Sequence, residues 1–193
     1  VLPLYLQTVR GESPLASGLT LLPGAIAMGV MNPITGRIFD RLGARNMSIA
    51  GMFLLVLTTA SFIPITAQTP VFYLTCLYAV RMFGISMVMM PVTTTGMNDL
   101  PLNLIGDGTV VNNTARQVFA SMGTAILVSI MSSVTLSHTP GSGVSQATPI
   151  LFKKLALNAN VLGFRYAFFI ATMFAVLGFL LTFFLKKDAR GGY

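Results

Sequence analysis

The side chains in this sequence that could act as acids, bases, nucleophiles or metal ligands are few and scattered. There is one histidine, one cysteine and a set of five acids, namely Glu12, Asp40, Asp99, Asp107 and Asp188. Enzymes that work in a bilayer need such groups clustered, as a nucleophile with its base or as a set of metal ligands. The sequence therefore predicts no catalytic residues, no metal site and no cofactor, and it argues against an enzyme.

Most of the charged residues in the central part of the chain lie in one short stretch, PITGRIFDRLGARN, residues 33–46. Asp40 can accept hydrogen bonds at a helix start or pair with an arginine of a neighbouring helix. Gly36 lets the chain leave a helix sharply or lets a neighbouring backbone approach. A loop that only keeps positive charge in the cytoplasm does not explain the aspartate or the glycines. The site residues predicted here are Gly36, Arg37, Asp40, Arg41, Gly43 and Arg45.

Further polar groups lie inside apolar runs. Arg81 stands near the middle of one run, where a charge costs roughly 2.5 to 3.5 kcal/mol, so it should face the protein interior or a water-filled cavity. Arg81 either serves a substrate pathway, or it snorkels or forms a buried pair that only locks helices together. Asn112, Asn113, Arg116 and Gln117 fall on one helical face, which either lines a cavity or makes interhelical hydrogen bonds. Further along the same run, a stripe of small residues predicts close helix contact: Ser121, Ala125, Ser129 and Ser133.

Composition places these groups in a membrane. Of the 193 residues, 54% are hydrophobic and 9% charged, with a mean hydropathy of +0.78. Soluble domains carry about 25% charged residues. The net charge of +7 does not indicate nucleic acid, because the basic residues lie at the ends of apolar runs rather than on a soluble face. The runs are also too long and continuous for barrel strands.

The elements that must position the polar groups are therefore membrane helices. We predict an all-α polytopic membrane bundle, with Ser13 as a helix cap, Pro14 at the first helical position and a short interfacial helix before the last span. VLPLYLQTV at the start reads like the end of a preceding helix, so residues 1–193 are expected to form one bundle of a longer protein. The predicted spans are 13–36, 47–65, 71–97, 106–135 and 161–185.

Basic residues near the span ends predict the orientation. Alternating crossings put six of them on one side, Arg37, Arg41, Arg45, Lys186, Lys187 and Arg190. The other side holds three, Arg10, Lys153 and Lys154. The positive-inside rule makes the first side cytoplasmic. The sequence thus predicts a multi-pass protein of the cell membrane with a cytoplasmic C-terminus.

Four motifs, in order along the chain, resemble the Major Facilitator Superfamily. GRIFDRLGAR is similar to its cytoplasmic-loop motif, with Ala44 as a slight departure. PLYLQTVRGESPLASGLTLLPGA (3–25), NNTARQVFASMGTAI (112–126) and GFRYAFFIA (163–171) resemble late helices of the fourteen-helix drug:proton antiporters of the EmrB/QacA type. The chain is similar to the C-terminal part of that group.

The resemblance implies a secondary transporter that exports small lipophilic drugs against proton influx by alternating access. It implies an N-terminal half that supplies the proton-coupling carboxylates. It also implies that the charges around Asp40 gate the cytoplasmic side, although a purely topogenic role stays open. The alternatives are a proton-coupled nutrient or metabolite symporter and a non-transporting membrane scaffold. The expected partners are substrate, protons, the lipid bilayer and the N-terminal half, without nucleic acid.

Overall fold

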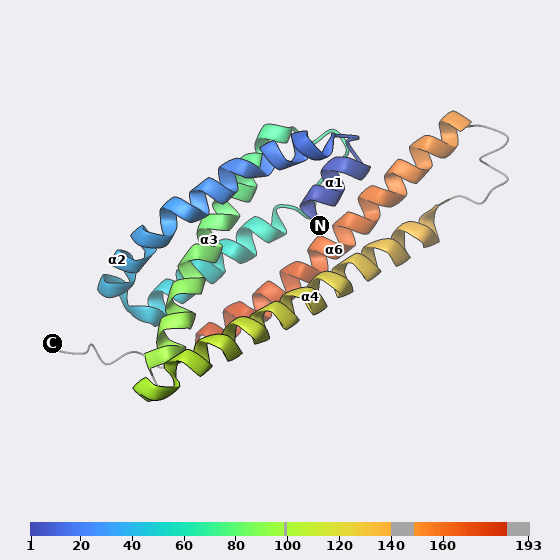
Figure 1. The fold of residues 1–193 in the computed structure, drawn as a ribbon. Helices are drawn as coiled ribbons and strands as arrows, with labels where there is room; N and C mark the ends of the chain where they lie inside the picture. Colours follow the sequence, from blue (N-terminus) through green and yellow to red (C-terminus); the bar gives the residue numbers. More distant parts are fainter. Residues whose placement is uncertain (99, 140–148, 185–193) are drawn as a thin grey trace.

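A computed structural model of the chain describes residues 1–98, 100–139 and 149–184. The described residues are helical apart from their connections (Figure 1). The elements are α1 (Leu2–Thr8), α2 (Pro14–Ala60), α3 (Val71–Asn98), the 3-10 turn η1 (Leu102–Leu104), α4 (Ile105–His138) and α6 (Pro149–Thr182). The predicted all-α membrane bundle is confirmed.

Helix α2 is two helical limbs joined by a sharp turn. Its start follows the prediction, because Ser13 Oγ accepts a hydrogen bond from Ala16 N at 3.2 Å and Pro14 follows the cap. The only non-helical residue within it is Gly43, with φ 76° and ψ 162°. Before and after Gly43 the limbs run in opposite directions (Figure 1). The predicted helix end at Gly36 is therefore wrong, since nothing between Gly36 and Gly43 breaks the helix.

Other boundaries also differ from the sequence prediction. The second limb of α2 ends at Ala60 rather than residue 65, because Pro64 disfavours helix in the residues just before it. The last helix begins at Pro149, so the predicted interfacial helix and the predicted span 161–185 form one continuous element, α6. No glycine or proline interrupts residues 150–160, and proline is favoured in the first turn of a helix.

Four of the described helices are long and apolar enough to cross a membrane, namely Pro14–Phe39, Val71–Thr94, Ile105–His138 and Leu151–Thr182. The second limb of α2, residues 44–60, rises about 25 Å, which is less than the roughly 30 Å of bilayer hydrocarbon. It can cross only with the help of its flanking turns. The predicted span 47–65 therefore stays a prediction.

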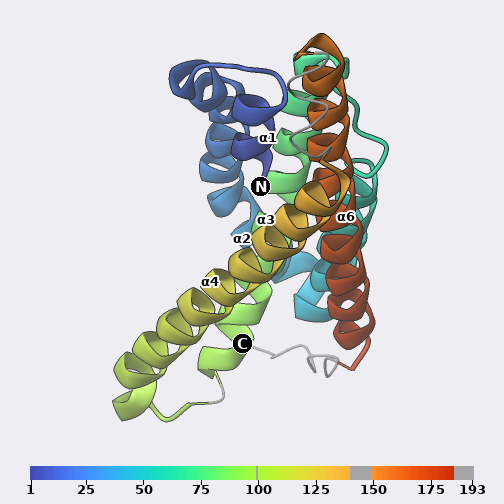
Figure 2. The same ribbon diagram turned by 90° about the vertical axis from the view of Figure 1, so that its right-hand side faces the viewer.

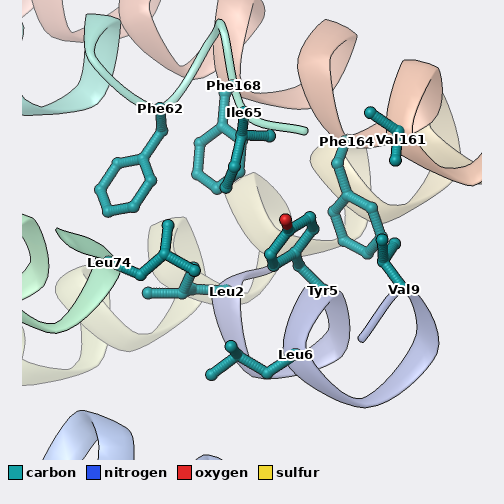
Figure 3. Packing of buried hydrophobic residues seen from close by; sticks show 10 residues of the cluster. All are labelled: Leu2, Tyr5, Leu6, Val9, Phe62, Ile65, Leu74, Val161, Phe164 and Phe168. Atoms are coloured by element: carbon teal, nitrogen blue, oxygen red, sulfur yellow. The ribbon is translucent and has the colours of Figure 1, made fainter. Parts of the chain in front are cut away.

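The helices pack around a core at one end of the bundle. Figure 3 shows Tyr5 of α1 against Phe164 of α6, with ring centroids 5.5 Å apart and edge-to-face, and Phe62 stacked on Phe168 at 5.0 Å. The apolar members of this cluster are Leu2, Tyr5, Leu6, Val9, Phe62, Ile65, Leu74, Val161, Phe164 and Phe168. α1 and α6 thus close over the turn between α2 and α3.

Three side chains donate hydrogen bonds to main-chain carbonyls of that turn. Tyr5 Oη donates to Thr66 O at 2.6 Å, and Arg165 Nε donates to Ile63 O at 3.0 Å. Arg10 Nη1 donates to the carbonyl oxygens of Ala67 and Thr69. Each donor satisfies a carbonyl where the helical hydrogen bonds of α2 have ended.

At its other end the bundle is open. α3 packs along α2, and α4 packs along α6, but α3 and α4 make few contacts with each other. Figure 1 shows α3 and α4 diverging from their connection, and Figure 2 shows α4 running obliquely across the bundle. No residue of α4 is buried. The side of the bundle that α4 presents is therefore largely uncovered.

The second limb of α2 and α3 approach each other closely at Gly51 and Gly84, and this contact gives a test of the packing. A Cβ on Gly51 would lie 2.8 Å from Val88 Cγ2 and 2.9 Å from Met87 Cβ. Gly51→Ala should therefore lower the melting temperature of the purified protein by several degrees, because backbones must separate. Gly18→Ala, in the same helix with nothing within 4 Å, should leave it unchanged or raise it. Equal melting temperatures for the two variants would contradict this packing.

Candidate functional site

The charged stretch 33–46 forms the turn of α2 and the helical residues around it. Arg37 is exposed and Arg45 is half-buried, on opposite sides of Gly43. The backbone at Asp40 and Arg41 is helical, but the side chains of both lie outside the described part of the structure. Their predicted gating pairs are therefore untested. The structure does show that Arg37, Asp40 and Arg41 belong to a helix rather than to a loop.

The two glycines of the motif have different roles. Gly43 adopts a conformation that is open essentially to glycine alone, and this makes the reversal of the chain possible. Gly36 is helical, and a Cβ built there would meet only Met90 Cε, at 3.5 Å. The predicted backbone approach at Gly36 is thus replaced by an ordinary contact with a side chain of α3.

Arg81 lies within α3 and is half-buried. Its Nε is enclosed and has no hydrogen-bond partner among the described residues. Gly24 of α2 lies against the ring of Tyr78 and near Met82 Cγ, so aromatic and thioether groups pack beside this part of α3. A guanidinium in such surroundings has donors to offer an anion.

A polar cluster that the sequence analysis missed joins α2 to α3. Ser86 Oγ donates to Asn32 Oδ1 at 2.9 Å and lies 3.1 Å from Thr35 Oγ1. Thr35 and Ser86 have no exposed surface. Pro33 lies between the two α2 residues and leaves a helical carbonyl one turn earlier without its usual donor. The sequence did hold one indication of this cluster, because Asn32 stands beside Pro33 within an apolar span.

The predicted polar face of α4 divides between two hollows. Asn113, Arg116 and Gln117 line an open groove of about 1140 Å³ that continues along α4. Asn112 instead lines a hollow of about 450 Å³ between α4, α3 and the second limb of α2, and Arg116 also contributes to this hollow. Arg116 Nη1 lies 3.4 Å from Met89 Sδ of α3. The four residues are therefore close together, but only Arg116 reaches both spaces.

The small-residue stripe of α4 does not mediate the close contact that was predicted. Ser121 and Ala125 line the open groove, and Ser129 and Ser133 are exposed as well. Contact between α4 and α6 occurs elsewhere, for example where Gly163 of α6 lies against Met131 O and Thr135 Oγ1. The stripe is thus left on the uncovered side of the described bundle.

Comparison with known proteins gives a consistent result. The sequence profile described as Major Facilitator Superfamily matches residues 1–124. The chain is 47% identical to the "Uncharacterized MFS-type transporter YcnB" of Bacillus subtilis, over 98% of this chain and 38% of the relative. It is 36% identical to the "Uncharacterized MFS-type transporter YhcA" of the same organism, over 98% of this chain and 42% of the relative.

A third relative carries a more specific name. The chain is 36% identical to the "Lincomycin resistance protein LmrB" of Listeria monocytogenes, over 97% of this chain and 38% of the relative. The chain therefore spans about two-fifths of the length of these curated relatives.

The reversal at Gly43 yields a prediction for the motif. Gly43→Ala should lower the free energy of unfolding by about 1–3 kcal/mol, because a residue with a Cβ is strained at φ 76°. The measurement is thermal unfolding of the purified protein. Gly36→Ala is the matched control, since its helical site accepts a methyl group in ordinary contact. A Gly43 variant as stable as the Gly36 variant would show that the turn does not have this conformation.

Proposed function

Because the chain belongs to the Major Facilitator Superfamily, we propose that it forms the C-terminal helix bundle of a proton-coupled exporter of drugs or other lipophilic small molecules. The observation that carries the proposal is the face of α4, which offers amide and guanidinium groups on an open groove of about 1140 Å³ in a helix that is apolar enough to cross a membrane. The similarity to LmrB, a lincomycin resistance protein, supports an antibiotic as substrate.

A second bundle is proposed to cover the open face of α4. Alternating access needs two bundles that move against each other around a site at their interface. α4 has no buried residue, and its small side chains, such as Ser121 and Ala125, allow another helix to approach closely. This chain spans about two-fifths of the length of its relatives, so the rest of such a protein is long enough to form a second bundle.

The polar groups have proposed roles in this arrangement. Asn113, Arg116 and Gln117 would contact substrate in the groove, as polar groups that orient a lipophilic molecule. Arg81 would face the substrate pathway from α3. The coupling carboxylates would come from the second bundle, since the acids whose side chains are described here, Glu12 and Asp107, lie before the start of α2 and in the first turn of α4.

The motif around Gly43 is proposed to gate the cytoplasmic side. Arg37, Asp40, Arg41 and Arg45 would form ion pairs with the second bundle in one conformation and lose them in the other. Such pairs bias the equilibrium between the two conformations by their differential interaction with each. The sharp reversal at Gly43 supports this role, because it brings charges from both limbs of α2 to one end of the bundle.

Transport is tested in everted vesicles that contain the full-length transporter. Adding lincomycin or ethidium should dissipate an imposed proton gradient, since the proton leaves as the drug is exchanged. Asp40→Asn should reduce the rate up to about fivefold at unchanged abundance, which corresponds to the loss of at most about 1 kcal/mol for an ion pair near the protein surface. Glu12→Gln, in the turn before α2, is the control and should transport normally. No drug-dependent proton flux in the unaltered protein would refute the exporter, and normal flux in Asp40→Asn would leave the motif a topogenic role.

The proposed orientation is tested by cysteine labelling. In a Cys76→Ser background, Asn46→Cys and Gln68→Cys place thiols at two exposed positions, one next to the turn of α2 and one between α2 and α3. A membrane-impermeant maleimide applied to intact cells should label position 68 only. Position 46 should react after the membrane is opened. Labelling of both from outside would refute a crossing by residues 47–65.

A further inference from the structure

The hollow between α3, α4 and the second limb of α2 is a separate space from the groove along α4. Its volume is about 450 Å³, and most of its wall is apolar, including Leu55, Ile85, Val88 and Phe119. It exists because α3 and α4 leave their connection at an angle and touch little beyond it. Phe119 at its rim is 71% exposed. The hollow is therefore open to a molecule that approaches from the side.

Polar groups gather toward one end of this hollow. α3 runs toward the connection and α4 runs away from it (Figure 2), so Thr93 and Asn112 lie nearer the connection than Ile85 and Phe119. From Ile85 to Thr93 the helix rises about 12 Å. Along that length the wall changes from apolar side chains to hydroxyl and amide groups. A molecule that fills the hollow must therefore be amphipathic, with its polar part near Thr93 and Asn112 and its apolar part near Ile85 and Phe119.

Arg116 gives the polar end its charge. A guanidinium has five N–H donors, and the contact that the described residues provide is with Met89 Sδ, which is a weak acceptor. Asp107 is the acid nearest to Arg116 on α4, and nine residues separate them by about 13 Å along the axis. No described carboxylate of α4 therefore reaches it. The ligand at this end should be an anion with several acceptor oxygens.

We propose that this hollow binds an anionic phospholipid, with its phosphate on Arg116 and Asn112 and an acyl chain along Ile85 and Phe119. Basic pockets between membrane helices on the cytoplasmic side suit such head groups, and the connection between α3 and α4 lies on the side that the basic residues predict to be cytoplasmic. A free phosphate would use Arg116 but leave the apolar wall uncovered. A zwitterionic phospholipid would also fill the wall and offer a phosphate, but its own cationic group competes with Arg116 for that phosphate, so it should bind more weakly than an anionic lipid.

The proposed lipid has a mechanical consequence. It fills the space between α3 and α4, so it holds the two helices apart at the end of the bundle where they already diverge. α3 carries Arg81 and α4 carries the polar face of the groove. Anionic lipid would therefore stabilise one spacing of the two helices that flank the proposed pathway.

The test measures lipid binding to the purified full-length transporter without substrate or proton gradient, so its outcome does not depend on whether the protein exports drugs. Phosphatidylglycerol and phosphatidylcholine of equal chain length are added to protein in neutral detergent. Thermal unfolding and native mass spectrometry report binding. We expect phosphatidylglycerol to raise the melting temperature more than phosphatidylcholine does. Arg116→Gln should weaken phosphatidylglycerol binding about tenfold, the loss expected for a charge-assisted hydrogen bond.

Controls separate the proposed site from its alternatives. Lys153→Gln removes one positive charge from an exposed position on α6 and should bind phosphatidylglycerol like the unaltered protein. Arg116→Lys keeps the charge and should keep the preference for phosphatidylglycerol, which supplies a result if the glutamine variant does not fold. Equal binding of both lipids, equal loss in the Lys153 variant, or full competition by glycerol phosphate would overturn the proposal. Arg116 would then be assigned to an acidic side chain of the second bundle or to a small anion.

Discussion

The described bundle depends on the hydrogen bonds that Tyr5, Arg10 and Arg165 donate to the turn between α2 and α3. A helix that ends in or near a bilayer leaves carbonyls without donors, and an unsatisfied carbonyl there costs several kcal/mol. Donors from α1 and α6 meet the carbonyls of Ile63 and Thr66 directly. Satisfying the turn therefore also ties the first and last helices to the second and third.

The same constraint explains why the two ends of the bundle differ. At the end with the turn between α2 and α3, aromatic rings such as those of Phe62 and Phe168 pack beneath this turn. At the other end α2 reverses at a single glycine, Gly43, so few carbonyls are released and no comparable set of donors is needed. α3 and α4 can then diverge, and the spaces between them stay open. Closed packing at one end and open faces at the other are what a bundle needs if it is to move against a second one.

The sequence predicted most of this fold because its strongest signals are local. Ser13 and Pro14 mark the start of α2, and long apolar runs mark α3 and α4 within three residues of each end. The sequence analysis placed the reversal of α2 at Gly36 rather than at Gly43. The sequence alone does not distinguish the two glycines, and only the backbone conformation shows that Gly43 has the positive φ. The contact of Ser86 with Asn32 joins residues 54 positions apart, and no spacing within one helix could reveal it. The sequence predicted a polar face on α4, and the division of its residues between two hollows depends on where α3 lies.

Arg81 and Arg116 both place a positive charge within a membrane span, but their surroundings in the structure differ. A charge within the hydrocarbon costs at least a few kcal/mol unless it meets an anion or water. Arg81 has an enclosed Nε within the packed part of α3, so an anion must reach it from the protein side, as a substrate group or a carboxylate of the second bundle. Arg116 lies at the mouth of a hollow beside an exposed Phe119, so an anion can reach it from the membrane itself. Arg81 is thus suited to the transport pathway alone, whereas Arg116 reaches both the groove and the hollow and can also respond to the composition of the surrounding bilayer.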